Sequence, residues 1–206
     1  MVRVKICGIT TTSDALAARD MGADAIGFVF AKSPRQVSVN TVKKISNALG
    51  LWIATVGVFV DEAPKRIMQI AAECALSAVQ LHGNYKPADM KKFGDIRVIK
   101  TFHVDTDFDP AHLGAYDQAD AFLFDTKIGN KVGGTGRVFD WNRLKKLSIK
   151  KPVIISGGLG PSNVVKAVSF FKPYGVDVSS GVEKSPGKKD LRLVREFIKN
   201  AKKIKF

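Results

Sequence analysis

Short runs of apolar residues alternate with longer amphipathic stretches along the chain. In the first run, Val2–Cys7, apolar residues occupy every second position, which is typical of a strand with two different faces. Further short apolar runs predict strands at Ala25–Phe30, Trp52–Val60, Ala78–His82, Arg97–His103, Ala121–Asp125, Pro152–Ser156 and Val176–Ser179. Apolar spacing typical of helices occurs between them, at Asp14–Met21, Val39–Leu49, Pro64–Cys74, Pro87–Phe93, Asp140–Leu147, Pro161–Phe170 and Asp190–Lys203. Three of these stretches place a proline in the expected first turn: Pro64, Pro87 and Pro161.

This alternation of strands and helices predicts an α/β fold with a parallel sheet. Eight such units close most simply into a single-domain (β/α)₈ TIM barrel, here expected to span residues 1–206. An open doubly wound sheet is disfavoured because no Gly-x-Gly-x-x-Gly turn follows the first strand. The segment Val104–Asp120 is polar and short, so we expect a reduced or missing helix after strand five.

The composition fits one compact cytoplasmic domain. The 206 residues are 45% hydrophobic and 25% charged, which is enough to build a core. No apolar run approaches the roughly 20 residues that span a bilayer, and the N-terminus enters a strand without a signal peptide. The cysteines, Cys7 and Cys74, make no disulfide framework and lie in no zinc-type cluster, so we expect reduced thiols and no metal.

The formal net charge of +14 raises the question of a nucleic-acid partner. The lysines are scattered over the predicted helices, apart from a group at Lys199–Lys205, and no aromatic residues are interleaved at RNA-binding spacing. We therefore favour a basic surface with a pocket for an acidic small molecule, and expect neither nucleic acid nor a membrane as partner. Nothing in the sequence decides between a monomer and a homodimer.

Glycine-rich segments follow the last two predicted strands. In a barrel, functional groups gather at the C-terminal strand ends, and the ends of strands seven and eight form a recurrent phosphate site. Gly157 and Gly158 follow strand seven, and Ser180 and Gly181 follow strand eight, where unhindered backbone N–H groups favour an anion. The glycines at 133–136, after strand six, form either a lid or an ordinary loop.

Cys7 and Asp125 end strands one and six, on either side of these phosphate-binding segments. A ligand lying between a thiol and a carboxyl is placed for proton transfer in two directions, as an isomerase requires. The thiol needs a lowered pKa to act as a base, and Lys5 on the same strand face is a candidate cause. The alternative, a pairing of Lys5 with Asp177 inside the barrel, stays open.

Two further side chains are candidates for ligand binding. Arg35 follows strand two on a proline-limited loop and suits a ligand carboxylate, although an ordinary surface arginine explains it equally well. His82 ends strand four, and either hydrogen-bonds a ligand or satisfies a loop carbonyl.

Motifs in matching order along nearly the whole chain resemble those of the phosphoribosylanthranilate isomerases of tryptophan biosynthesis. They are Lys5-Ile-Cys-Gly-Ile-Thr10, Gly27-Phe-Val-Phe30, Ser33-Pro-Arg35, Val56-Gly-Val-Phe-Val60, Val79-Gln-Leu-His-Gly83, Leu123-Phe-Asp-Thr126, Gly133-Gly-Thr-Gly136, Phe139-Asp-Trp141, Ser156-Gly-Gly-Leu159, Gly175-Val-Asp-Val-Ser-Ser-Gly-Val-Glu183 and Pro186-Gly-Lys-Lys-Asp190.

The resemblance implies an Amadori rearrangement of N-(5-phosphoribosyl)anthranilate to 1-(2-carboxyphenylamino)-1-deoxyribulose 5-phosphate, without a cofactor. It is the third step of tryptophan synthesis from chorismate. The resemblance makes Asp125 the general acid and Cys7 the general base. The substrate-binding residues that it implies are Arg35, His82, Gly134, Gly157, Gly158, Asp177, Ser180 and Gly181.

Two other enzyme functions compete with this one. One is a related barrel isomerase acting on another sugar phosphate, although such relatives usually have a carboxylate at the position of Cys7. The other is covalent catalysis by Cys7 with His82, which the separation of strands one and four disfavours.

Overall fold

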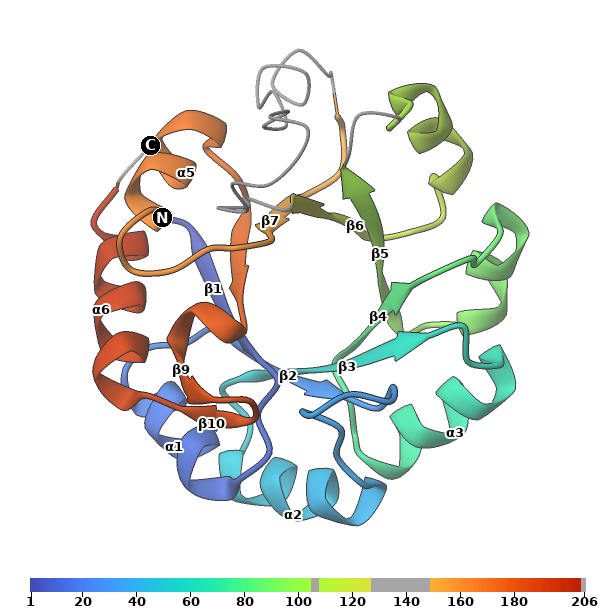
Figure 1. The fold of residues 1–206 in the computed structure, drawn as a ribbon. Coiled ribbons are helices and arrows are strands. Elements are labelled where there is room, and N and C mark those ends of the chain that lie inside the picture. The colour runs from blue at the N-terminus through green and yellow to red at the C-terminus, as the bar shows by residue number, and fades with distance from the viewer. Residues whose placement is uncertain (105–107, 127–148, 205–206) are drawn as a thin grey trace.

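Eight parallel strands close into a barrel in the computed structural model, which describes residues 1–104, 108–126 and 149–204 (Figure 1). Each strand pairs with the next along the chain, and the last pairs with the first. The strands are β1 (Arg3–Cys7), β2 (Ala25–Val29), β3 (Ala54–Val60), β4 (Ala78–His82), β5 (Arg97–Val104), β6 (Ala121–Thr126), β7 (Val153–Ser156) and β8 (Gly175–Val178). The predicted TIM barrel is confirmed.

Helices cover the outside of the barrel (Figure 1). The α-helices are α1 (Thr12–Asp20), α2 (Val39–Leu49), α3 (Pro64–Glu73), α5 (Val164–Phe171) and α6 (Leu191–Lys202). In the described residues between β5 and β6, the helical element is the 3₁₀ helix η2 (Pro110–Tyr116), which confirms the predicted reduced helix there. The unit after β4 is reduced as well, to the 3₁₀ helix η1 (Pro87–Phe93). The helix expected at 140–147 lies outside the described residues.

The predicted start of α5 at Pro161 is wrong, because the helix begins at Val164. The Asn163 side chain accepts a hydrogen bond from the Gly160 backbone N–H at 2.8 Å and donates to the Gly158 carbonyl at 3.0 Å. These bonds hold the preceding residues as a turn, since an Asn side chain can replace the backbone partners of a helix. Among the helices that the structure describes, none is long and apolar enough to cross a bilayer.

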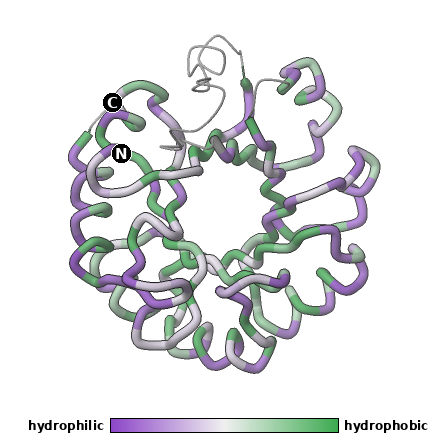
Figure 2. The backbone as a smooth tube through the Cα atoms, in the orientation of Figure 1, coloured by the Kyte–Doolittle hydropathy of each residue, from purple (hydrophilic) through white to green (hydrophobic). Residues whose placement is uncertain are grey.

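The apolar core has two layers. The larger layer lies between the strands and the helices and includes Val4, Ile6 and Phe124, and a smaller one fills the barrel interior. The interior cluster is Val56, Ala78, Ile99, Ala121, Leu123 and Ile154. Figure 2 shows the resulting pattern, with hydrophobic strands inside and hydrophilic segments on the outer helices. On β1, Val4 and Ile6 face the helices while Lys5 lies in the interior, as the alternation predicts.

The third strand is shorter than predicted. It begins at Ala54, and the side chains of Leu51 and Trp52 are 92% and 96% exposed. Gly50, with φ 72°, ends α2 immediately before them. Apolar composition alone does not separate a strand from an exposed loop, so the pattern extended the strand too far toward the N-terminal end of the barrel.

A small antiparallel hairpin, β9 (Glu183–Ser185) and β10 (Lys188–Lys189), follows β8 and the 3₁₀ turn η3 (Ser180–Val182). The hairpin was not predicted, because its strands are short and polar. The Thr10 hydroxyl donates to the Gly187 carbonyl at 2.6 Å, which ties the hairpin to the loop that follows β1. Side chains of the hairpin are thereby brought to the C-terminal mouth of the barrel.

Candidate active site

The predicted site residues that the structure describes lie at or near the C-terminal ends of the barrel strands. Cys7, His82 and Asp125 belong to β1, β4 and β6, and Asp177 belongs to β8. The neighbouring loops supply the others, Arg35, Gly157, Gly158, Ser180 and Gly181. Gly134 and the rest of the glycine segment after β6 lie outside the described residues. Parallel strands bring these ends to one side of the barrel.

A chain of polar contacts crosses the barrel interior beneath this mouth. The buried Lys5 ammonium donates to Asp177 Oδ1 at 3.0 Å and to Gln80 Oε1 at 2.7 Å. Ser156 Oγ donates to Asp177 Oδ2 at 3.4 Å. Burial disfavours the charge on Lys5, but Asp177 more than offsets it, so the pKa of Lys5 is raised and the side chain stays charged. Lys5 therefore pairs with Asp177, and its charge also acts to lower the pKa of the Cys7 thiol, so the two predicted roles of Lys5 occur together.

The Cys7 thiol lies buried at the end of β1. A Cβ atom on Gly27 of β2 would lie 2.7 Å from Cys7 Sγ, so the glycine leaves the space that the sulfur occupies. Burial raises the pKa of the Cys7 thiol, and the positive charges of Lys5 and Lys189 oppose that effect only in part. The thiol is therefore protonated at neutral pH in this structure, contrary to the lowered pKa that a base needs.

Asp125 at the end of β6 faces a histidine that sequence reasoning missed. Nδ1 of His103, on β5, lies 3.6 Å from Asp125 Oδ2. The register pairs His103 with Asp125 and Asp125 with Ser156 of β7. The strand order β6, β7, β8, β1 then separates Asp125 from Cys7 by the ends of two strands. His103 is a polar residue near the end of a strand, two positions after Thr101 and therefore on the same strand face. That position is the signal in the sequence that could have identified it.

His82 continues the polar chain from Gln80. Gln80 Nε2 lies 2.6 Å from His82 Nε2. Burial, with added repulsion from Lys5, lowers the pKa of His82 to about 3, so its ring is neutral and its Nε2 accepts this hydrogen bond. A neutral histidine whose acceptor nitrogen is engaged by Gln80 does not suit the alternative of a Cys7–His82 catalytic pair.

The two glycine segments pack backbone against backbone. Gly157 and Gly158 have φ of 91° and 62°, a region that glycine adopts without steric cost. A Cβ atom on Gly181 would overlap the Leu159 carbonyl oxygen, so only glycine allows the loops after β7 and β8 to approach this closely. The Gly160 N–H is already bound to Asn163. The two glycine segments therefore lie side by side at the ends of β7 and β8.

Arg35 forms a bidentate ion pair within the protein. Its Nε and Nη2 donate to the Glu183 carboxylate at 2.8 Å and 2.6 Å. Lys189, also buried, donates to Glu183 Oε1 at 2.9 Å. Burial opposes ionisation of Glu183, but the hydrogen bonds from Arg35 and Lys189 outweigh it and keep the pKa of Glu183 below its usual range. Sequence reasoning did not single out Glu183 or Lys189, since their partners are distant in the chain.

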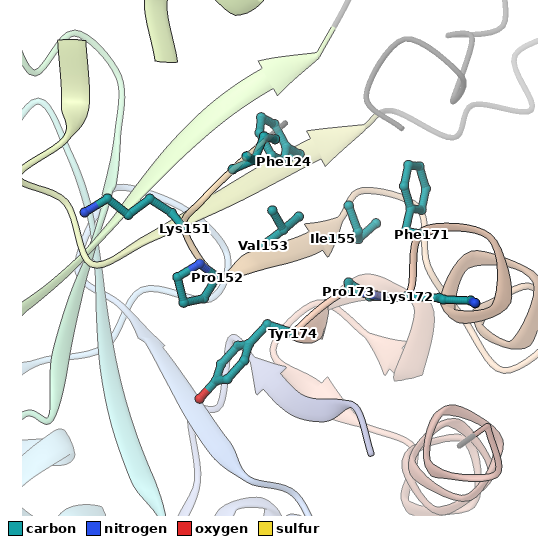
Figure 3. Close-up of a pocket in the computed structure, with 10 residues that line it drawn as sticks. Phe124, Lys151, Pro152, Val153, Ile155, Phe171, Lys172, Pro173 and Tyr174 are labelled. Carbon is teal, nitrogen blue, oxygen red and sulfur yellow. The ribbon is translucent and has the colours of Figure 1, made fainter. Parts of the chain in front are cut away.

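The pocket in Figure 3 is a different feature. It has a volume of about 330 Å³ and lies on the outer side of β6 and β7, where Phe124, Val153, Ile155 and Phe171 border it. Its described lining includes none of the predicted site residues. In the described part of the chain, no group of three His, Cys, Asp or Glu side chains comes together as a metal site.

Comparison with known proteins gives one family. The family model for N-(5'-phosphoribosyl)anthranilate (PRA) isomerase matches residues 4–200. A curated relative of that name from Petrotoga mobilis is 41% identical, over 100% of this chain and 99% of its own. A solved phosphoribosyl anthranilate isomerase in complex with reduced 1-(o-carboxyphenylamino)-1-deoxyribulose 5-phosphate is 42% identical with a TM-score of 0.88, over 99% of this chain and 100% of its own. A solved structure of mutually generated monomers of the dimeric enzyme from Thermotoga maritima is 40% identical with a TM-score of 0.87, over the same shares. The chain therefore belongs to the family of N-(5'-phosphoribosyl)anthranilate isomerases.

Proposed function

We propose that this protein catalyses the Amadori rearrangement of N-(5-phosphoribosyl)anthranilate, the third step of tryptophan synthesis from chorismate. The observation that supports it best is the position of Asp125 and Cys7 on either side of the glycine segments after β7 and β8. A phosphate bound to those segments leaves the sugar between a carboxyl and a thiol. Relatives that share this fold over nearly the whole chain are isomerases by name.

The reaction needs two proton transfers. Protonated Asp125 gives its proton to the ribose ring oxygen as the bond between C1 and that oxygen breaks, and the anthranilate nitrogen forms a Schiff base with C1. Cys7, as the thiolate, then takes the proton from C2, which gives the enol-amine and the Cys7 thiol. As the ketone forms at C2, the proton of the 2-hydroxyl group goes to Asp125 and the thiol proton goes to C1, so both side chains return to their starting states. The transfers are internal to the substrate and the two side chains, so no redox partner is needed.

Two cations near Cys7 favour the thiolate that the reaction needs, while burial favours the neutral thiol. Lys5 and Lys189 are the cations that oppose the effect of burial on its pKa. Their positive charges stabilise the thiolate more strongly than they stabilise the neutral thiol, because the buried site has a low dielectric constant. The base therefore becomes more available as the pH rises.

An assay with the substrate made in place tests the proposal. Anthranilate and phosphoribosyl pyrophosphate, with the transferase that joins them, produce the labile substrate, and its fluorescence is followed with and without this protein. Decay faster than spontaneous breakdown, and absent with Cys7→Ser, supports the proposal. If folded wild-type protein gives no acceleration, the competing function, isomerisation of another sugar phosphate, is tested with a panel of such substrates.

We also propose that two copies associate through the N-terminal end of the barrel. The exposed Leu51 and Trp52 stand beside a cavity of about 470 Å³ at that end, whose lining includes Ala54, Val56 and Trp52 itself. A protruding apolar loop and a cavity on one face can fill each other across a two-fold axis. The described part of the cavity rim has charges of both signs, Arg3, Arg97, Asp24 and Asp120, which suits a self-complementary contact. The Thermotoga maritima relative is described as dimeric.

A further inference from the structure

We propose that Glu183, held in place by Lys189, is a positioning residue that orients Arg35 toward the carboxylate of the substrate. The inference rests on the proposed function, because it assigns Arg35 to the anthranilate end of that substrate. Its new content concerns the β9–β10 hairpin, which supplies Glu183 and Lys189 and contains neither of the two proposed proton-transfer groups.

The ion pair fixes the plane of the Arg35 guanidinium. Two parallel hydrogen bonds from Nε and Nη2 to one carboxylate leave it no rotational freedom. Within the described residues, Nη1 has no hydrogen bond to the protein. The guanidinium edge formed by Nε and Nη2 therefore holds the orientation of Arg35, and the edge that contains Nη1 remains available for a ligand.

The aliphatic stem of Arg35 lies at the mouth of β1. A Cβ atom on Gly8 would lie 2.6 Å from Arg35 Cδ and 2.9 Å from Ser179 Oγ, so the arginine side chain crosses directly over the residue that follows Cys7. The Cys7 sulfur contributes electrostatically to the raised pKa of Arg35, behind the larger effect of the Glu183 hydrogen bonds. Arg35 therefore lies beside the candidate base.

Lys189 gives Glu183 a second, independent anchor. The side chain is 1% exposed, and its ammonium donates to Glu183 Oε1 at 2.9 Å and to the Ser179 carbonyl at 3.1 Å. Burial lowers the pKa of Lys189, and Glu183 opposes this by favouring the charged form. An ammonium held by both a carboxylate and a backbone carbonyl fixes the carboxylate relative to β8.

The three charged side chains together have a net positive charge that one bound anion can neutralise. Arg35 and Lys189 are positive and Glu183 is negative, so the triad has one surplus positive charge. A single ligand carboxylate on Arg35 makes the group neutral, which favours binding in a partly buried site. Without Lys189, Arg35 would be the single positive charge of the group, beside two carboxylates, that of Glu183 and that of the ligand.

Glu183→Gln tests the role with a matched pair of substrates. The variant is assayed with N-(5-phosphoribosyl)anthranilate and with N-(5-phosphoribosyl)aniline, which lacks the carboxylate. We expect KM for the anthranilate substrate to rise at least about tenfold while kcat stays within about threefold, because the lost interaction is one of binding. With the aniline substrate, wild type and variant should differ by less than about twofold in KM.

Asp24→Asn is the control, because Asp24 also joins an arginine and a lysine, at the opposite end of the barrel. It should leave both KM values unchanged. Lys189→Met is the second variant, used if Glu183→Gln does not fold. It should raise KM for the anthranilate substrate alone, and it should lower kcat equally for both substrates because Lys189 also favours the Cys7 thiolate. An unchanged KM in a folded variant overturns the inference, as does an equal rise for both substrates, which would indicate a merely structural role. Inactive wild type would instead contradict the proposed function.

Discussion

Two triads of arginine, carboxylate and lysine lie at opposite ends of this barrel. At the N-terminal end, Asp24 pairs with Arg3 at 3.0 Å and with Lys202 at 2.8 Å. At the C-terminal end, Glu183 pairs with Arg35 at 2.6 Å and with Lys189 at 2.9 Å. The chemistry is the same, but the Arg3 and Asp24 side chains are 63% and 19% exposed, whereas those of Arg35 and Glu183 are 23% and 4% exposed.

Burial separates the roles of the two triads. The Asp24 triad is the more exposed of the two, because the Arg3 side chain lies largely in solvent, and it joins the C-terminal part of α6 to β1. An exposed ion pair contributes about 0–1 kcal/mol. The Glu183 triad is desolvated, so each hydrogen bond in it is stronger and its geometry is better defined. The Asp24 triad at the N-terminal end supports the fold, while the Glu183 triad at the C-terminal end is suited to position a ligand.

The largest expected effect is on catalysis at the C-terminal end. Cys7→Ser and Asp125→Asn should each reduce kcat by at least about a thousandfold, because each removes one of the two proton-transfer groups of the proposed mechanism. Steady-state fluorescence assays of the purified variants measure this. Cys74→Ser is the matched control, since Cys74 lies at the end of α3 and contacts the Val39 carbonyl on α2, and it should keep kcat near the wild-type value. A Cys7→Ser variant with normal turnover would rule out the thiol as the base.

Breaking the buried ion pair of the barrel interior should have the next largest effect. Asp177→Asn leaves the Lys5 charge without its carboxylate, and should lower the free energy of unfolding by about 3–5 kcal/mol. Asp24→Asn should cost about 1 kcal/mol or less. Urea denaturation followed by circular dichroism compares them. Similar losses for the two variants would show that burial does not separate the ends of the barrel.

The pH dependence of stability should reflect His82. Its pKa in the folded protein is about 3, below the ordinary value of 6.5, so the unfolded chain binds the proton more readily. Stability from the neutral ring is fully present above pH 6.5 and is lost as the pH falls toward 3. Between pH 6.5 and 4.5 the free energy of unfolding should fall by about 2 kcal/mol. His82→Gln should flatten this part of the profile, and an unchanged slope would contradict the assignment.

The smallest expected effect on activity comes from the N-terminal end. Trp52→Glu should leave kcat/KM within about twofold of wild type, because the side chain lies on the face opposite the site. Sedimentation velocity should show the wild type as a dimer and the variant as a monomer. Leu191→Glu, which changes an exposed apolar residue at the start of α6, should remain a dimer. A monomeric wild type at micromolar concentration would contradict the proposed association.

Several site features followed from local patterns. The alternation on β1 predicted that Lys5 and Cys7 share the interior face, and parallel strands necessarily bring Asp125 and the glycine segments to the same end. Other features depend on contacts between distant residues. Arg35 and Glu183 lie 148 positions apart in the chain, and no local period relates them.

The amino-acid sequence by itself determined the barrel, its strand order and the end at which the functional groups gather. These follow from hydrophobic periodicity and from the geometry of parallel strands, which are properties of each segment and its neighbours. Only the tertiary structure decided that Lys5 pairs with Asp177, that the Cys7 thiol has a raised pKa, that Trp52 is exposed and that Arg35 is held by the hairpin. Those outcomes depend on burial and on the distance between charges, which arise when separate segments pack together.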